Sequence, residues 1–386
     1  MRALKVDDQR FKFVSKFITG TFSDNLHAKR IASLTNGTLG VMASASLAVS
    51  IIGLSLAQAR GLANKHAVKQ VDRLLSNQGV VVWDLFSPWV AQAIGERTSA
   101  LIAMDWTDFD ADDQTTLAFS LVTNHGRATP LLWLTVFKGE LKDRRNHYED
   151  LCLSRLAQVL PPGVAVTILA DRGFGDTKLF AFLHELGFDY VIRFRGNIHV
   201  TAADGETRAA ADWVGKGGRA RKLRDAEVTA ARHKVGAVVC VHAKDMKDPW
   251  CLAASNADAT AREIVNYYAK RWTIEPGFRD TKDLRFGMGL GVLRIADPQR
   301  RDRLLLLNAF AIVLLTLLGT AGESLGMDRH LKVNTAKHRT HSVFRQGCML
   351  YGLIPNMREI QLQPLIERFA EFILDFPTFT QAFSVT

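Results

Sequence analysis

Two hydrophobic segments that each end in an aspartate constrain the fold of this chain most strongly. SALIAM, residues 99–104, precedes Asp105, and VAVTILA, residues 164–170, precedes Asp171. Short apolar runs of this kind are typical of buried strands. A carboxylate at the end of a buried strand is costly unless it is paired, hydrogen-bonded or bound to a metal. If the two strands are neighbours, their aspartates form a site for a divalent cation that prefers oxygen ligands, Mg²⁺ or Mn²⁺.

The segments around these strands alternate between strand and helix patterns. After the strand at 99–104, the sequence predicts strands in 116–126 and 127–139, a helix over 146–160, the strand at 164–170, a helix over 176–187 and a strand over 188–194. The order of three strands, helix, strand, helix, strand predicts an α/β fold with a mixed sheet and covering helices.

Basic residues outnumber acidic ones, with 49 Lys and Arg against 39 Asp and Glu and a formal charge of +10. Such a surface attracts polyanions, although this alone is a weak indication of nucleic-acid binding. Two segments concentrate the charge. Residues 64–77 predict a helix with one apolar and one basic side, which suits DNA docking or an ordinary solvated surface equally. Residues 191–235 hold ten Lys or Arg against five Asp or Glu, in short β-like runs.

The compartment and the membrane relation follow from composition. The four cysteines are scattered without metal-ligand spacing, which predicts reduced thiols, and the N-terminus has no signal-peptide pattern. We therefore expect a cytoplasmic protein. Residues 304–322 are apolar and long enough to span a bilayer. Burial in the protein core is the simpler interpretation, because residues 304–322 directly follow the segment that carries the candidate site residues described below. A membrane anchor is the alternative.

A third group of residues lies on one predicted helix, from about residue 261 to 283. Tyr268, Arg271, Glu275 and Lys282 have offsets of 0, 3, 7 and 14, which places them within about 60° of one another on a continuous helix. A proline and a glycine directly after Glu275 are expected to kink the helix there, so Lys282 is the least secure member of the stripe. A solvated face could use the arginine and glutamate as a salt bridge, but it would not need the tyrosine.

The pattern Y-x2-R-x3-E-x6-K, with its two upstream aspartates, resembles the DDE transposases of bacterial insertion sequences. More narrowly, it is similar to insertion-sequence family four, the YREK group. The resemblance extends over most of the chain and is carried by these segments in order: HAVKQVDRLLSN, MDWTD, ADRGF, RFRGNI, PWCLAASN, NYYAKRWTIEPGFRDTK and NTAKHR.

The resemblance implies an RNase H-like catalytic core interrupted by a β-rich insertion and flanked by helical regions. We expect a helical DNA-binding region at 1–98, the first part of the core at 99–190, the insertion at 191–249, the second part of the core at 250–325, and a helical C-terminal region at 326–386.

The resemblance also assigns the site. The catalytic and metal-binding triad would be Asp105, Asp171 and Glu275, and the DNA contacts would be Tyr268, Arg271, Lys282 and Trp250. The aromatic ring of Trp250 would stack on a base flipped out of the duplex, unless Trp250 is a core residue; Trp213 is the alternative. For the first aspartate the alternatives are Asp108, Asp110, Asp112 and Asp113, but Asp105 directly ends the hydrophobic strand.

The implied activity is cut-and-paste transposition of double-stranded DNA. Two Mg²⁺ or Mn²⁺ ions would serve cleavage at the terminal inverted repeats, a hairpin intermediate, and joining of the 3′ hydroxyl to target DNA, with a homodimer in the synaptic complex. The alternative function is an inactive or domesticated relative that only binds DNA.

Overall fold

A ten-stranded sheet forms the centre of the computed structural model, which describes residues 2–374. Its strands are β1 (Ser99–Phe109), β2 (Gln114–Leu121), β3 (Thr129–Phe137), β4 (Ala165–Ala170), β5 (Asp189–Phe194), β6 (His199–Thr201), β7 (Thr207–Ala209), β8 (Arg221–Val228), β9 (His233–Val241) and β10 (Trp250–Ala254). They lie in the order β3-β2-β1-β4-β5-β10-β9-β8-β6-β7.

The first half of this sheet is mixed. β2 pairs antiparallel with β1 and β3, whereas β1, β4 and β5 run parallel to one another. Every residue of β2 is buried, as expected for a strand covered on both faces. This arrangement confirms the mixed α/β sheet predicted from the sequence, and its strand order β3-β2-β1-β4-β5 is consistent with an RNase H-like core.

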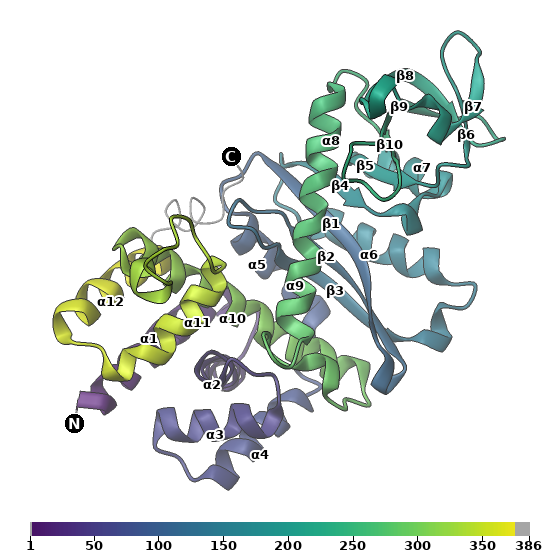
Figure 1. Ribbon diagram of the computed structural model, residues 1–386. Helices are drawn as coiled ribbons and strands as arrows, with labels where there is room; N and C mark the ends of the chain where they lie inside the picture. Colours follow the sequence, from purple (N-terminus) through teal and green to yellow (C-terminus); the bar gives the residue numbers. More distant parts are fainter. Residues whose placement is uncertain (1, 375–386) are drawn as a thin grey trace.

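The segment between β5 and β10 continues the same sheet. β9 pairs with β10, β8 with β9, β6 with β8, and β7 with β6, all antiparallel. The β-rich insertion thus extends the core sheet at the end beyond β10. Figure 1 shows this extension at the end of the molecule away from the N-terminal helices.

Two helices between the core strands carry residues of interest. They are α6 (Arg145–Val159) and α7 (Thr177–Glu185). The predicted helix at 261–283 is divided into α8 (Ala261–Lys270), a 3-10 turn at Arg271–Thr273, and α9 (Ile274–Lys282). α8 and α9 cross the sheet in Figure 1.

Helices on either side of the core in sequence pack together at one end of the sheet (Figure 1). The N-terminal ones are α1 (Arg2–Phe22), α2 (Ala28–Ser44), α3 (Val49–Arg60), α4 (Asn64–Leu75) and α5 (Val82–Ile94). The later ones are α10 (Pro298–Ser324), α11 (Val343–Leu353) and α12 (Glu359–Leu374). Residues 375–386 of the expected helical C-terminal region lie outside the described residues.

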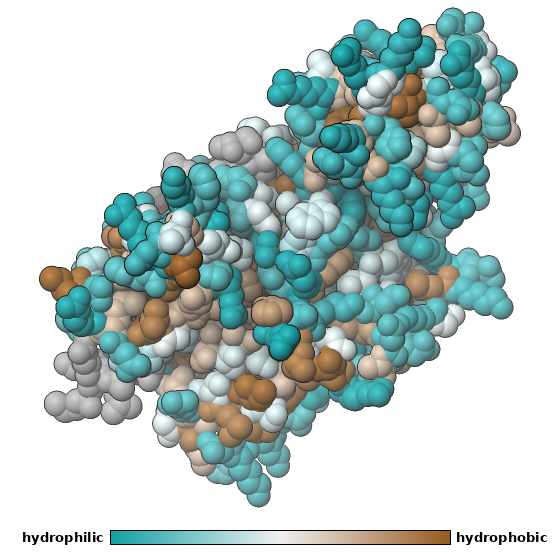
Figure 2. Space-filling model, in the orientation of Figure 1, coloured by the Kyte–Doolittle hydropathy of each residue, from teal (hydrophilic) through white to brown (hydrophobic). Residues whose placement is uncertain are grey.

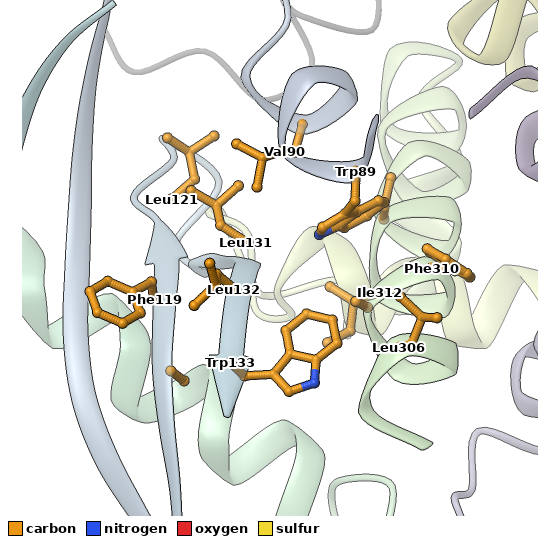
Figure 3. Packing of buried hydrophobic residues seen from close by; sticks show 14 of the residues in the cluster. Trp89, Val90, Phe119, Leu121, Leu131, Leu132, Trp133, Leu306, Phe310 and Ile312 are labelled. Atoms are coloured by element: carbon orange, nitrogen blue, oxygen red, sulfur yellow. The ribbon is translucent and has the colours of Figure 1, made fainter. Parts of the chain in front are cut away.

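α10 is the central helix of the core. It is long and apolar enough to cross a membrane, but 89% of its most apolar window is buried inside the protein. Phe310 lies 5.2 Å from Trp89 of α5 between ring centroids, and Trp89 donates a hydrogen bond to the Pro130 carbonyl at 3.0 Å. Figure 3 shows these aromatic side chains packed between α10, α5 and β3. The apolar stretch of this helix is accounted for by its burial in the protein core.

Candidate active site

Asp105 and Asp171 each follow the last residue pair of the parallel β1–β4 ladder, but only Asp171 follows the end of its strand. The prediction that Asp105 ends a strand is wrong, because the hairpin with β2 continues β1 to Phe109 and pairs Asp105 with Ala118. In the β1–β4 ladder Met104 pairs with Ala170, so the two aspartates follow the last pair. Asp105 Oδ1 accepts the Trp106 backbone N–H at 2.9 Å, and Asp171 Oδ1 accepts that of Gly173 at 2.7 Å. The sheet therefore places the two carboxylates at the same level of neighbouring strands, because the segments that precede them are hydrophobic, parallel and in register.

The electrostatics of Asp105 reflect this placement. Burial, assisted by the nearby carboxylates of Asp171 and Glu275, raises the pKa of the Asp105 carboxyl to about 6, although Arg271 and the Trp106 N–H oppose the increase. A cation bound beside this carboxyl would stabilise its charged form. The three proposed triad members are thus close enough to influence one another's charge.

Arg271 lies between two of these carboxylates. Its Nη1 is 3.3 Å from Asp105 Oδ2, and its Nη2 donates to Glu275 Oε1 at 2.5 Å. Its side chain is only 11% exposed, and its guanidinium carbon lies 5.8 Å from the centre of the Tyr268 ring. Tyr268, Arg271 and Glu275 therefore lie together, on the side of β1 that carries the Asp105 carboxylate.

The break in the helix occurs before Glu275 rather than after it. The residues 271–273 form a 3-10 turn, and Pro276 lies in the first turn of α9. Proline lacks an N–H, and its ring conflicts with the carbonyl four residues earlier, which belongs to Trp272. The expected kink after Glu275 was therefore misplaced, because the proline acts on the preceding turn.

Lys282 reaches the same strand from the far end of α9. Its Nζ is 3.2 Å from Thr107 Oγ1 and 2.5 Å from the Asp108 carbonyl oxygen. Burial lowers the pKa of the Lys282 ammonium, although Asp108 and Asp110 oppose the decrease. Lys282, the member of the stripe that the expected kink made least secure, thus lies beside Thr107 of β1, two residues beyond Asp105.

A family model for the transposase DDE domain matches residues 97–314, more than half of the chain. The chain belongs to the DDE transposase family. The matched region runs from the start of β1 into α10 and contains all the residues described above. A search of curated proteins found no match.

The donor chemistry of the transposase domain suits a hard divalent cation, since Asp105, Asp171 and Glu275 offer only oxygen ligands. Within residues 2–374, however, no group of three or more His, Cys, Asp or Glu side chains is arranged closely enough to hold a metal ion. In this arrangement the guanidinium of Arg271 contacts both Asp105 and Glu275. The residues fit a metal in kind and in strand position.

The two candidate tryptophans have different environments. Trp250 begins β10, is half-buried, and packs edge-on against Tyr268 with ring centroids 4.8 Å apart. Trp213 is 1% exposed and donates its indole N–H to the Val200 carbonyl at 3.3 Å. Stacking on a base needs an exposed ring face, so Trp213 has no face to offer in this conformation.

The alternative aspartates behind Asp105 are engaged elsewhere. Asp108 and Asp110 pair with Lys138, and Asp112 pairs with Arg301 at 2.5 Å. These contacts belong to the tip of the β1–β2 hairpin and to its junction with α10. They give Asp108, Asp110 and Asp112 structural roles away from the site.

The predicted basic helix corresponds to α4. Its Val71, Leu74 and Leu75 are buried, while polar and basic side chains line a concave surface on another face: Ser33, Lys65, His66, Lys69, Gln70, Arg73 and Asn77. The second basic segment, residues 191–235, contributes most of the insertion, over which Figure 2 shows mainly hydrophilic residues.

A contact between segments distant in sequence fixes α9, and no sequence pattern indicates it. Arg127, in the β2–β3 turn, donates from Nε to Asp280 Oδ2 at 2.5 Å, and the next residue's N–H donates to the Thr273 carbonyl at 3.3 Å. The partners Arg127 and Asp280 are 153 residues apart in sequence, and neither stands out by its pattern. Trp272, 60% exposed beside Arg271, was also missed because it lies off the predicted stripe.

Proposed function

We propose that this protein is an active transposase that cleaves the ends of a mobile DNA element and joins them to target DNA. Asp105, Asp171 and Glu275 would form its catalytic triad. The observation that carries the proposal is the meeting of three elements: Asp105 and Asp171 follow the last pair of the parallel β1–β4 ladder, and Arg271 contacts both Asp105 and Glu275, the latter in the first turn of α9.

The triad would hold two Mg²⁺ or Mn²⁺ ions, which when bound supply activation of the attacking oxygen and charge neutralisation at phosphorus. The chain's own groups supply the rest. Arg271 and Lys282 place cationic groups along β1, beside Asp105 and Thr107, where they can bind the phosphates next to the cut. Arg271 must then exchange its present carboxylate contacts for phosphate.

We further assign the chain to the YREK group of insertion-sequence family four, whose signature it carries at Tyr268, Arg271, Glu275 and Lys282. The assignment implies a hairpin intermediate at the element end and a homodimer that pairs two ends. Trp250 supports this reading, since its ring is only half-buried and lies beside Tyr268, and we expect it to stack on an extruded base. Such a protein acts on chromosomal DNA and would work in the bacterial cytoplasm.

The test is Asp171→Ala, measured in two assays with DNA that carries the inverted repeats flanking the gene. Asp171 accepts a backbone N–H but lies outside the hydrophobic core, so the variant should fold. We expect Mg²⁺-dependent nicking to be lost and binding in a gel shift to be retained, because a ligand for the metal is not a contact for DNA. The matched control, Asp245→Ala, removes an exposed carboxylate from the insertion and should change neither result.

Two outcomes would contradict the proposal. Nicking by Asp171→Ala at the wild-type rate would remove Asp171 from the triad. Absence of nicking by the wild-type protein, with end binding intact, would instead identify an inactive relative that only binds DNA.

A further inference from the structure

The first turn of α6 connects the two segments that carry Asp105 and Asp171. On one side, Glu149 Oε1 accepts the indole N–H of Trp106, the residue after Asp105, at 2.9 Å. On the other side, Asn146 donates to Asp176 Oδ2, in the loop that follows Asp171, at 3.0 Å. α6 thus contacts the segments that follow Asp105 and Asp171. No residue of this helix belongs to the signature or to the triad.

Arg145 is held at the centre of this connection. Its Nε donates to the same Glu149 Oε1 that accepts from Trp106, at 2.9 Å. Its guanidinium carbon lies 5.8 Å from the centre of the Trp106 ring and 5.3 Å from that of Phe174. Two aromatic rings and a carboxylate therefore fix the direction of one guanidinium.

The acceptor in this arrangement is itself buried. The Glu149 side chain is 6% exposed, and burial raises the pKa of its carboxyl while the hydrogen bonds from Trp106 and Arg145 oppose the increase. An ordinary surface pair with i,i+4 spacing contributes little and leaves both side chains mobile. Here the Glu149 side chain is enclosed, so it can hold the Arg145 side chain in a fixed position.

The outer end of Arg145 faces the Asp171 loop and solvent. The side chain is 44% exposed, and its Nε is already engaged, so the two Nη groups are the donors available to a ligand. A Cβ at Gly173 would lie 3.6 Å from Arg145 Nη2 and 3.0 Å from Asp171 Oδ1. The guanidinium and the carboxylate therefore flank a residue that has no side chain, and this space is open to a substrate.

We propose that Arg145, beside the open space at Gly173, forms a further phosphate-binding site, which holds the DNA strand on the Asp171 side of the active site. The inference rests on the proposed function, because it takes DNA as the substrate. Arginine suits this role, since its planar fork binds two phosphate oxygens at once. Glu149 and Trp106 are positioning residues that aim the fork.

The site complements the contacts already assigned. Successive side chains of a strand point to opposite faces; Asp105 faces Arg271, whereas Trp106 faces α6. Arg271 and Lys282 thus approach β1 from the α8–α9 side and Arg145 from the α6 side. Backbone phosphates on both sides of the cut would be gripped from opposite faces of the sheet.

The experiment combines an arginine variant with neutral phosphates in the DNA. Arg145→Gln and wild type are titrated with duplexes from the flanking inverted repeat, each carrying one methylphosphonate at a defined position. If Arg145 binds a phosphate, the variant loses about tenfold in affinity for unmodified DNA, and one or two methylphosphonates weaken wild-type binding without weakening that of the variant. The slope of log affinity against log salt should also decrease by about 1.

Further variants separate binding from packing. Arg144→Gln is the matched control, because it removes an exposed neighbouring charge that lies over Tyr148. Its binding should still be weakened by the same methylphosphonates that weaken wild-type binding. Arg145→Lys should retain the salt slope but lose bidentate affinity. Glu149→Gln should keep the salt slope and reduce cleavage, and Gly173→Ala, which fills the space without removing a charge, should weaken binding.

If Arg145→Gln loses only thermal stability and its binding is weakened by the same methylphosphonates as that of wild type, Arg145 has a structural role and the proposal is overturned. That result is distinguishable from failure of the proposed function, which is decided separately by whether Asp171→Ala still nicks DNA. A methylphosphonate effect that is equal in wild type and Arg145→Gln at every position would overturn it equally.

Discussion

The ion pair between Arg127 and Asp280 is predicted to hold α9, and with it Glu275, against the β2–β3 turn. Arg127 Nε and Asp280 Oδ2 are 2.5 Å apart, and the two side chains are 20% and 14% exposed. The Ala128 N–H bond to Thr273 lies at the other end of the same contact. We expect a single change in either charged residue to loosen α9 from the sheet.

The magnitude follows from how far the pair is buried. Exposed pairs contribute about 0–1 kcal/mol, whereas removing one partner of a fully buried pair costs about 3–5 kcal/mol, because the other charge is left uncompensated. With both side chains mostly but not fully buried, Arg127→Gln or Asp280→Asn should each cost about 2–3 kcal/mol, between these limits. The double variant leaves no buried charge and two amides that can bond, so it should recover at least half of that loss.

The assay is a double-mutant cycle from urea unfolding of all four proteins, with DNA nicking measured on the same samples. Arg285→Gln, an exposed arginine just beyond α9, is the control and should change neither quantity. Nicking should fall in both single variants under conditions where they remain folded, and recover in the double variant. A coupling energy below about 0.5 kcal/mol would refute the reasoning, because two independent residues give additive effects.

Two other properties should follow from single residues. Burial raises the pKa of the Asp302 carboxyl to about 7, although hydrogen bonds from Thr135 oppose this; a raised acid pKa contributes stability that is complete below the unfolded-state value and is lost as pH rises through about 7. Unfolding midpoints should therefore decrease from pH 5 to 8 in wild type and change less in Asp302→Asn; parallel profiles would exclude Asp302 as the cause. Trp250→Ala should leave the first nick nearly intact and lower the hairpin yield, with partial rescue by an abasic nucleotide at the flipped position. Equal loss of both steps, measured on denaturing gels, would mark Trp250 as a packing residue.

The sequence was sufficient for those parts of the fold that local pattern determines. The segments that precede Asp105 and Asp171 are continuous apolar runs, and such runs have few alternatives to a buried strand. The mixed sheet was accessible from the order of strands and helices, whereas the continuation of β1 past Asp105 was not. The grouping of Tyr268, Arg271 and Glu275 was also accessible, because the helical repeat brings residues at offsets of 3 and 7 to one side.

What the sequence could not give depends on contacts between distant segments. Arg145 and Glu149 have the spacing of an ordinary surface pair, and only the arrival of Trp106 from β1 shows that the glutamate is enclosed. The break at 271–273 was misplaced because a helical wheel assumes a continuous helix, while proline acts four residues back. Trp213 and Trp250 could not be ranked, since their exposure depends on strands that the insertion adds.

The charged start of α10 shows how the N-terminal helices are joined to the active-site sheet. Arg300 donates to Asp72 at 2.6 Å and to Ser76 at 2.5 Å, at the end of α4. Arg303, 3% exposed, donates to the carbonyls of residues 75 and 80, and Asp302 accepts the Thr135 hydroxyl of β3 at 2.6 Å. Consecutive side chains of one helical turn therefore bind the basic helix on one side and the sheet on the other. If a duplex binds on α4, these bonds, of which those of Arg303 and Asp302 are buried, would hold it at a fixed position relative to the sheet.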